Sequence, residues 1–222
     1  MMRSRVIETS EGIQDEMEVR LFDEAKRMMR DRGWLETNDV IGAGIDKGSV
    51  LEVGSGPDYL GLEWLKKTKK TRLTGLEISS NMIKVAQKNA GEYGLESRVR
   101  YVLGDAHKLP FNDNEFDGVF SCESLHEWVK PGLIFSEIYR VLKPNGEFFV
   151  GDLRRDMNPF MVFLMKALVK SREMKEGLMS SINAAYTAEE IKHMLVKTGI
   201  RNCSIHRNLM GICIVGEKRV AD

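Results

Sequence analysis

The stretch from Val50 to Gly61, VLEVGSGPDYLG, constrains the fold more than any other part of this chain. A mostly apolar run over residues 49–53 meets a glycine pair, Gly54 and Gly56, and apolar residues then recur at helical spacing. This pattern predicts a strand, a tight turn and a helix. Glycine is needed where a backbone turns sharply or approaches a ligand closely, and the free N–H groups at the start of a helix favour a ligand there. The stretch therefore predicts a binding loop.

Strands and helices are expected to alternate after this loop. The further strands are expected at Leu73 to Ile78, Val99 to Gly104, Phe116 to Cys122 and Glu147 to Asp152, with a final hairpin at Cys203 to His206 and Met210 to Val215. Strands that alternate with helices at this interval indicate a doubly wound α/β sheet. We therefore predict seven strands, mostly parallel with a C-terminal antiparallel hairpin, and helices on both faces.

At 222 residues the chain is expected to form a single domain. Its predicted parts are an N-terminal helical cap (1–45), a core that carries the loop (46–152), a helical insertion (153–186), and a C-terminal helix and hairpin (187–222). In the cap, residues before Gln14 are expected to be a loose tail. The insertion is rich in methionine and phenylalanine, which suit an adaptable apolar pocket. We expect it to be a lid over the substrate, with a core or dimer-interface role as the alternative.

Composition narrows the class of protein. Acidic and basic residues balance at 33 each, which lowers the expectation of a nucleic-acid partner. The three cysteines form neither a disulfide framework nor a paired metal motif, which fits a reducing compartment. The sequence shows no signal peptide and no apolar stretch of membrane-spanning length. We therefore predict a cytoplasmic protein without a membrane span, a bound metal or a nucleic-acid partner, present as a monomer or homodimer.

Two classes of ligand use a strand, loop and helix of this kind. A dinucleotide fingerprint is G-x-G-x-x-G with an acidic residue about 20 residues further on. Glu77 stands at the position of that acidic residue, but Tyr59 stands at the position of the third glycine. Glu52 and Asp58 flank the glycines, and two carboxylates would repel a pyrophosphate. They suit a ligand with an ammonium group and a positive sulfur, such as S-adenosylmethionine. The alternatives are a strand-end carboxylate for Glu52 and a helix N-cap for Asp58.

Five successive motifs resemble those of class I S-adenosylmethionine-dependent methyltransferases, in particular the small-molecule branch (methyltransferase type 11) that includes quinone-biosynthesis enzymes. They are VLEVGSGPD from Val50, LTGLEISSNMIKVAQ from Leu73, GDAHKLPF from Gly104, EFDGVFSCESLHEW from Glu115 and RVLKPNGEFFVGD from Arg140. The resemblance implies a Rossmann-like fold, S-adenosyl-L-methionine as cofactor and S-adenosyl-L-homocysteine as product. It also implies methyl transfer to a small-molecule acceptor, which we expect to proceed by in-line displacement.

The resemblance also implies, position by position, which residues bind the cofactor. They are Glu52, Gly54, Ser55, Gly56, Asp58, Glu77, Ile78, Asp105, Ala106 and Ser121. Glu77 would bind the ribose hydroxyls, and Asp105 would accept from the adenine amino group. Ile78 and Ala106 would pack on the adenine ring. The methionine end would be held by Glu52, Gly54 and Gly56, with Ser121 beside it. Asp58 is the main departure, because the family usually has its third glycine there.

Three residues outside these motif roles are candidates for chemistry. His126 follows the fourth expected strand and is the candidate catalytic base, with a packed histidine at a helix start as the alternative. Arg154 and Tyr186 are candidates for the acceptor pocket, where Arg154 could hold an anionic acceptor. The other functions left open are methyl transfer to a protein, cofactor binding without transfer, and nicotinamide-dependent oxidation or reduction.

Overall fold

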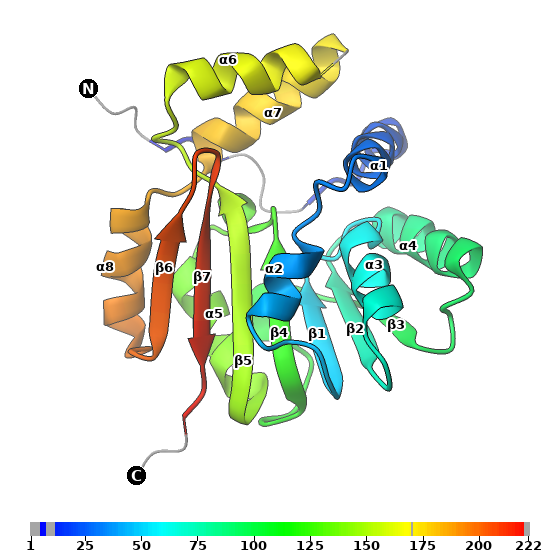
Figure 1. Cartoon of the computed structure of the whole chain (residues 1–222), viewed down its shortest axis with the longest axis vertical. Helices are drawn as coiled ribbons and strands as arrows, with labels where there is room; N and C mark the ends of the chain where they lie inside the picture. The colour runs from blue at the N-terminus through cyan, green and yellow to red at the C-terminus, as the bar shows by residue number, and fades with distance from the viewer. Residues whose placement is uncertain (1–4, 8–11, 170, 220–222) are drawn as a thin grey trace.

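A seven-stranded sheet forms the centre of the computed structural model, which describes residues 5–7, 12–169 and 171–219 (Figure 1). The strands are β1 (Ser49–Val53), β2 (Arg72–Glu77), β3 (Val99–Leu103), β4 (Phe116–Cys122), β5 (Leu142–Leu153), β6 (Cys203–Arg207) and β7 (Gly211–Glu217). Their order is β3-β2-β1-β4-β5-β7-β6. The first five pair in parallel, and β7 runs antiparallel to both β5 and β6. The predicted sheet and its final hairpin are confirmed.

Helices cover both faces of this sheet (Figure 1). They are α1 (Glu16–Asp31), α2 (Thr37–Gly42), α3 (Tyr59–Lys67), α4 (Ser80–Tyr93), α5 (Pro131–Val141), α6 (Pro159–Leu168), α7 (Arg172–Ala184) and α8 (Ala188–Thr198), with 3-10 turns η1 (Ala106–Lys108) and η2 (Leu125–Glu127). In Figure 1, α2 and α3 lie in front of the sheet and α5 lies behind it. The predicted layering is therefore confirmed.

Alternate residues of the strands supply two separate cores. Leu51 and Val53 of β1 face the core made with α5 and α8, whereas Val50 faces the core made with α2 and α3. Val119 and Phe120 of β4 divide in the same way. Successive side chains of a strand point to opposite faces, so a strand that is buried on both faces is apolar throughout. This explains the nearly continuous apolar run that begins the loop stretch.

The loop between β1 and α3 turns at three residues with left-handed backbone. They are Gly54, Gly56 and Asp58, with φ angles of 72°, 54° and 63°. The Gly54 amide donates to the Leu76 carbonyl oxygen at 2.9 Å, which fixes the loop at the carboxyl end of β2. The chain order also reverses between β1 and β4. Ligands bind at such a reversal in open α/β sheets, so the fold places the loop where a site is expected.

Helices α1, α6 and α7 lie beyond the carboxyl ends of the parallel strands, in the upper part of Figure 1. The expected loose tail is wrong at Arg5, whose guanidinium donates to the carbonyl oxygens of Ala184 and His126, each at 2.6 Å. It also stacks 4.1 Å from the centre of the Tyr186 ring. Arg5 therefore ties the start of the chain to the end of α7 and to η2. Within the described residues, no helix has the length and apolar character needed to cross a bilayer.

Candidate cofactor site

Two cavities formed by the described residues meet at the loop after β1. The first cavity is lined by Glu77, Ile78, Asp105 and Ala106, among others, and the second by Lys26, Glu36, Glu52, Ser55 and Cys122, among others. Gly54, Gly56, Phe22 and Glu123 line both. The loop therefore stands at the middle of one elongated site with two ends of different chemistry.

Glu77 ties the loop to the end of β2 inside the first cavity. Its carboxylate accepts from the amides of Gly56, Ile78 and Ser79, each at 2.9 Å. Burial raises the pKa of Glu77, and these amides offset part of that rise. A carboxylate has about four acceptor positions, so three backbone donors leave one position for a ligand hydroxyl.

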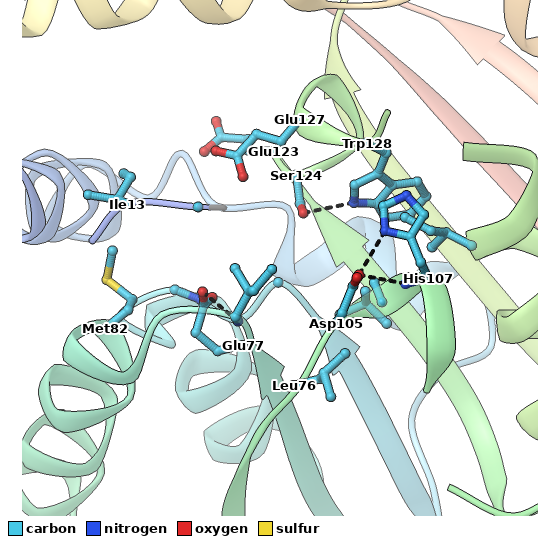
Figure 2. Close-up of a pocket in the computed structure, with 18 of the residues that line it drawn as sticks. Ile13, Leu76, Glu77, Met82, Asp105, His107, Glu123, Ser124, Glu127 and Trp128 are labelled. Atoms are coloured by element: carbon cyan, nitrogen blue, oxygen red, sulfur yellow. Dashed lines mark hydrogen bonds and ion pairs between the residues drawn. The ribbon is translucent and has the colours of Figure 1, made fainter. Parts of the chain in front are cut away.

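The far wall of the first cavity lies at the end of β3 and in η1. Figure 2 shows Asp105 and His107 on this wall, with Glu77 and Met82 across the cavity. The Asp105 carboxylate accepts from the His107 amide at 2.8 Å and pairs with His107 Nδ1 at 2.7 Å. Burial acts to raise the pKa of Asp105, but both His107 groups outweigh it and lower that pKa. Asp105 is therefore an ionised acceptor beside the apolar surface of Ile78 and Ala106.

Asp58 lies behind the loop, which corrects the expectation that its carboxylate faces the ligand. The side chain is completely buried, lines neither cavity and accepts from the Tyr101 hydroxyl. Asp58 is the N-cap residue of α3, as the alternative predicted, but its side chain makes no capping hydrogen bond. Burial raises the pKa of Asp58 to about 6, and burial together with the Asp58 charge raises that of Glu52 well above its usual value. Asp58 Oδ1 and Glu52 Oε2 both lie against Gly61, so we infer that the two carboxyls share a proton and that the loop carries less negative charge than the sequence indicates.

Two serines predicted to bind the cofactor differ in position. Ser55 lines the second cavity, where its buried hydroxyl has no hydrogen-bond partner within the described part of the chain. Ser121 lines neither cavity and donates to the Val53 carbonyl oxygen at 2.7 Å, and its place beside the ligand stays a prediction. A buried polar atom normally has a partner. The Ser55 hydroxyl therefore fits a polar ligand atom at this end of the site.

Gly54 lies where the loop packs closely against Ser124, so a residue with a side chain would not fit there. A Cβ atom built on Gly54 would lie 2.4 Å from Ser124 Oγ, on the opposite wall of the site. Figure 2 shows Ser124 beside Glu123, above Glu77 and Met82. The site is therefore narrow at the loop, and the residues present fit S-adenosylmethionine: an apolar end with an acid for the nucleoside, a bare backbone, and a charged end for the amino acid.

The structure places His126 outside both cavities. Its amide donates to Asp152 at 2.6 Å, and its Nδ1 lies 2.9 and 3.0 Å from the two Asp152 carboxylate oxygens. The imidazole is buried against β5. This pairing fixes η2 on the sheet, and the catalytic role of His126 stays a prediction.

Arg154 and Tyr186 also lie outside both cavities, and their place in an acceptor pocket under the insertion stays a prediction. The Arg154 guanidinium pairs with both carboxylate oxygens of Asp156, at 2.8 and 2.9 Å. The Tyr186 hydroxyl donates to the Trp128 carbonyl oxygen at 2.7 Å. Both side chains thus bind other parts of the chain in this structure.

Sequence reasoning missed three charged residues of the second cavity. Lys26 of α1 pairs with Glu123, and Glu36 lines the same cavity. Burial raises the pKa of Glu36, with an opposing effect from Lys26. Lys26 stands in an otherwise ordinary amphipathic helix, and no signal in the sequence separates it from the other basic residues. Glu123 follows the end of β4, a position where a ligand contact could have been expected.

Comparison with known proteins agrees with this site. Residues 51–150 match the family described as a methyltransferase domain. The ubiquinone/menaquinone biosynthesis C-methyltransferase UbiE of Chromobacterium violaceum is 30% identical over 77% of this chain and 74% of its own length. A fatty-acid O-methyltransferase of Mycolicibacterium smegmatis is 36% identical over 50% of this chain and 39% of its own length.

A solved structure from Methanococcus maripaludis, assigned as an S-adenosyl-L-methionine-dependent methyltransferase, superposes with a TM-score of 0.75. It is 25% identical and covers 94% of this chain and 95% of its own. The match spans the cap, the sheet and the insertion, so the likeness extends beyond the loop. On the sequence relationship and the two-ended site together, the chain belongs to the class I S-adenosylmethionine-dependent methyltransferases.

Proposed function

We propose that this protein transfers the methyl group of S-adenosyl-L-methionine to a small-molecule acceptor and releases S-adenosyl-L-homocysteine. The observation that carries the proposal is the continuity of the two cavities across Gly54 and Gly56. One end offers apolar surface and the Glu77 and Asp105 carboxylates, and the other offers charged groups of both signs. An adenosine joined to an amino acid has this distribution of chemistry.

The contacts of the described residues suggest how the cofactor lies. The remaining acceptor position of Glu77 would take a ribose hydroxyl, and Asp105 would accept from the adenine amino group. The adenine ring would lie between Ile78 and Ala106, which line the first cavity. The amino-acid end would pass over the glycines toward Ser55, whose hydroxyl is unsatisfied.

The reaction would be an in-line displacement at the methyl carbon. A lone pair of the acceptor forms the new bond as the carbon–sulfur bond breaks, and the electron pair of that bond stays on sulfur as a neutral thioether. A proton leaves the acceptor where the nucleophilic atom carries one. Alignment of the acceptor and exclusion of water supply the rate in such a step. The chain's contribution is therefore to hold sulfonium and acceptor in line beneath α1 and the insertion.

An apolar acceptor fits the insertion that we predicted to be a lid. Helix α6 exposes Phe160 and Phe163, each with 68% of its surface accessible. The two relatives are named for ubiquinone/menaquinone biosynthesis and for O-methylation of fatty acids, which supports an apolar acceptor. A protein acceptor and cofactor binding without transfer are the alternatives.

The neutral charge balance and the unpaired Cys122, Cys203 and Cys213 support the further proposals of a non-nucleic-acid acceptor and a cytoplasmic location.

Glu77→Gln should weaken binding of S-adenosylhomocysteine about 30-fold, because one oxygen acceptor replaces two and the new amide faces backbone donors. Isothermal titration calorimetry on the purified protein measures the effect. Glu92→Gln, at an exposed position of α4, is the matched control and should bind as the wild type does. Absence of binding to the wild-type protein at millimolar ligand would contradict the proposed function.

The transfer step needs its own measurement. Cell extract incubated with the protein and methyl-labelled S-adenosylmethionine should yield a labelled small molecule, identified by mass spectrometry. A labelled protein would point to the protein-acceptor alternative. Tight cofactor binding without a labelled product in extracts that contain varied acceptors would favour a binding protein.

A further inference from the structure

The N-terminal helix contributes a cation to the second cavity. Among the lining residues in the described part of the chain, Lys26 is the only lysine or arginine. Its side chain is 16% exposed, and its ammonium group pairs with the Glu123 carboxylate. The same group lies 5.3 Å from the centre of the Phe22 ring. A cation buried this far requires an anionic partner, and Glu123 provides one.

Lys26 stands among several acidic groups. Burial lowers its pKa, while the charges of Glu36, Cys122, Asp152 and Glu52 act to raise it. Glu36 and Glu52 line the cavity together with the amine. The cavity thus has acidic groups that can pair with an ammonium ion and one cation, Lys26, that can pair with a carboxylate. These are the two charged groups of a free amino acid.

We propose that Lys26 binds the carboxylate of the cofactor's methionine end, while the ammonium group of that end faces the carboxylates of the same cavity. This inference rests on the proposed function and adds a residue of the N-terminal helix to the cofactor site. The cofactor carboxylate replaces Glu123 as the partner of Lys26. One ion pair breaks as another forms, and no proton has to move.

The backbone at Glu123 supports such an exchange. Its φ of 54° is left-handed, which is uncommon for a residue other than glycine. Its amide donates to the Gly151 carbonyl oxygen at 2.9 Å, which holds the backbone without help from Lys26. Because Glu123 lines both cavities, its carboxylate can leave Lys26 and remain inside the site. The loop therefore need not move when the ion pair changes partners.

A pair of ligands that differ by one group tests the inference. Isothermal titration calorimetry should show that Lys26→Met weakens S-adenosylhomocysteine binding about 10- to 100-fold, since a buried charge-assisted pair is lost. Binding of the decarboxylated analogue, which keeps the ammonium group, should not weaken by more than about twofold, because this ligand brings no carboxylate for Lys26. Lys26→Arg should restore most of the affinity for S-adenosylhomocysteine.

Arg20→Met removes a positive charge from the exposed side of the same helix and is the matched control. It should leave both affinities unchanged, and thermal unfolding should show that each variant is folded. Equal losses for the two ligands in Lys26→Met, or no loss for either, would overturn the role of Lys26 alone. Failure of the wild-type protein to bind S-adenosylhomocysteine would overturn the proposed function and this inference with it.

Discussion

Gly61→Ala should lower the free energy of unfolding by about 2 kcal/mol, although Gly61 lies in the helix α3. Alanine is the better helix former by about 1 kcal/mol, so propensity alone predicts a more stable protein. The added Cβ, however, would lie 2.1 Å from Asp58 Oδ1, 2.4 Å from Glu52 Oε2 and 2.4 Å from Leu73 Cδ2. All three side chains are buried. Overpacking of this kind costs about 1–3 kcal/mol or more, and here it also separates two carboxyls that share a proton.

Gly177→Ala is the matched control for this substitution. Gly177 lies inside α7, and an added Cβ there meets no atom within 4 Å. The control should therefore gain the helix propensity and raise the free energy of unfolding by about 0.5–1 kcal/mol. Urea unfolding of both variants measures the two changes. A stable Gly61→Ala protein would mean that Asp58 and Glu52 can move apart without cost.

The sheet could be predicted because its signals are local in sequence. Each strand that is buried on both faces is a short apolar run between turn residues, as residues 49–53 show. The helix at Ala188–Thr198 begins with a capping box made by Thr187 and Glu190, both within one turn. None of these inferences needs a contact between distant parts of the chain.

The site was predictable only where it depends on strand ends. Glu77 and Asp105 each follow a strand, and both line the first cavity as the sequence indicates. The hydroxyl that donates a hydrogen bond to Asp58 belongs to Tyr101, 43 residues further on, and no local pattern shows this pairing. Arg154 differs, because its partner Asp156 stands two residues away and could have been recognised as a local ion pair.

Lys26 could not be predicted for a related reason. Its helix packs over the carboxyl ends of the strands only in the folded protein, and the helix shows one apolar face as many surface helices do. The register that brings Lys26 to Glu123 depends on where the cap meets the sheet. Contacts between the cap and the core are therefore the part of this site that requires a structure.

Asp58→Asn should make the protein more stable above neutral pH, by about 2 kcal/mol at pH 8, because it removes a buried negative charge. The pKa of Asp58 rises from the usual 3.8 to about 6 on folding, with burial as the main cause. Between these values the folded protein binds more protons than the unfolded chain. The free energy of unfolding of the wild type therefore falls as pH rises from about 4 to 6, and above that range the loss is complete.

The asparagine keeps the contacts that the site needs. Its oxygen can accept from the Tyr101 hydroxyl as Asp58 does, and its amide can donate to Glu52 Oε2 in place of the proton that the two carboxyls share. Urea unfolding at pH 4.5 and at pH 8 should show a small difference from the wild type at the lower pH and the full gain at the higher. Asp31→Asn, at an exposed position, should change the free energy of unfolding by less than about 0.5 kcal/mol at either pH.

Binding of S-adenosylhomocysteine separates this effect from a ligand contact. Asp58 lines neither cavity, so Asp58→Asn should change the dissociation constant by less than about threefold. A gain in stability with unchanged binding means that the carboxyl pair supports the loop without contacting the cofactor. A loss of stability at pH 8 would mean that Glu52 and Asp58 do not share a proton, and a large loss of binding would place Asp58 in contact with the cofactor.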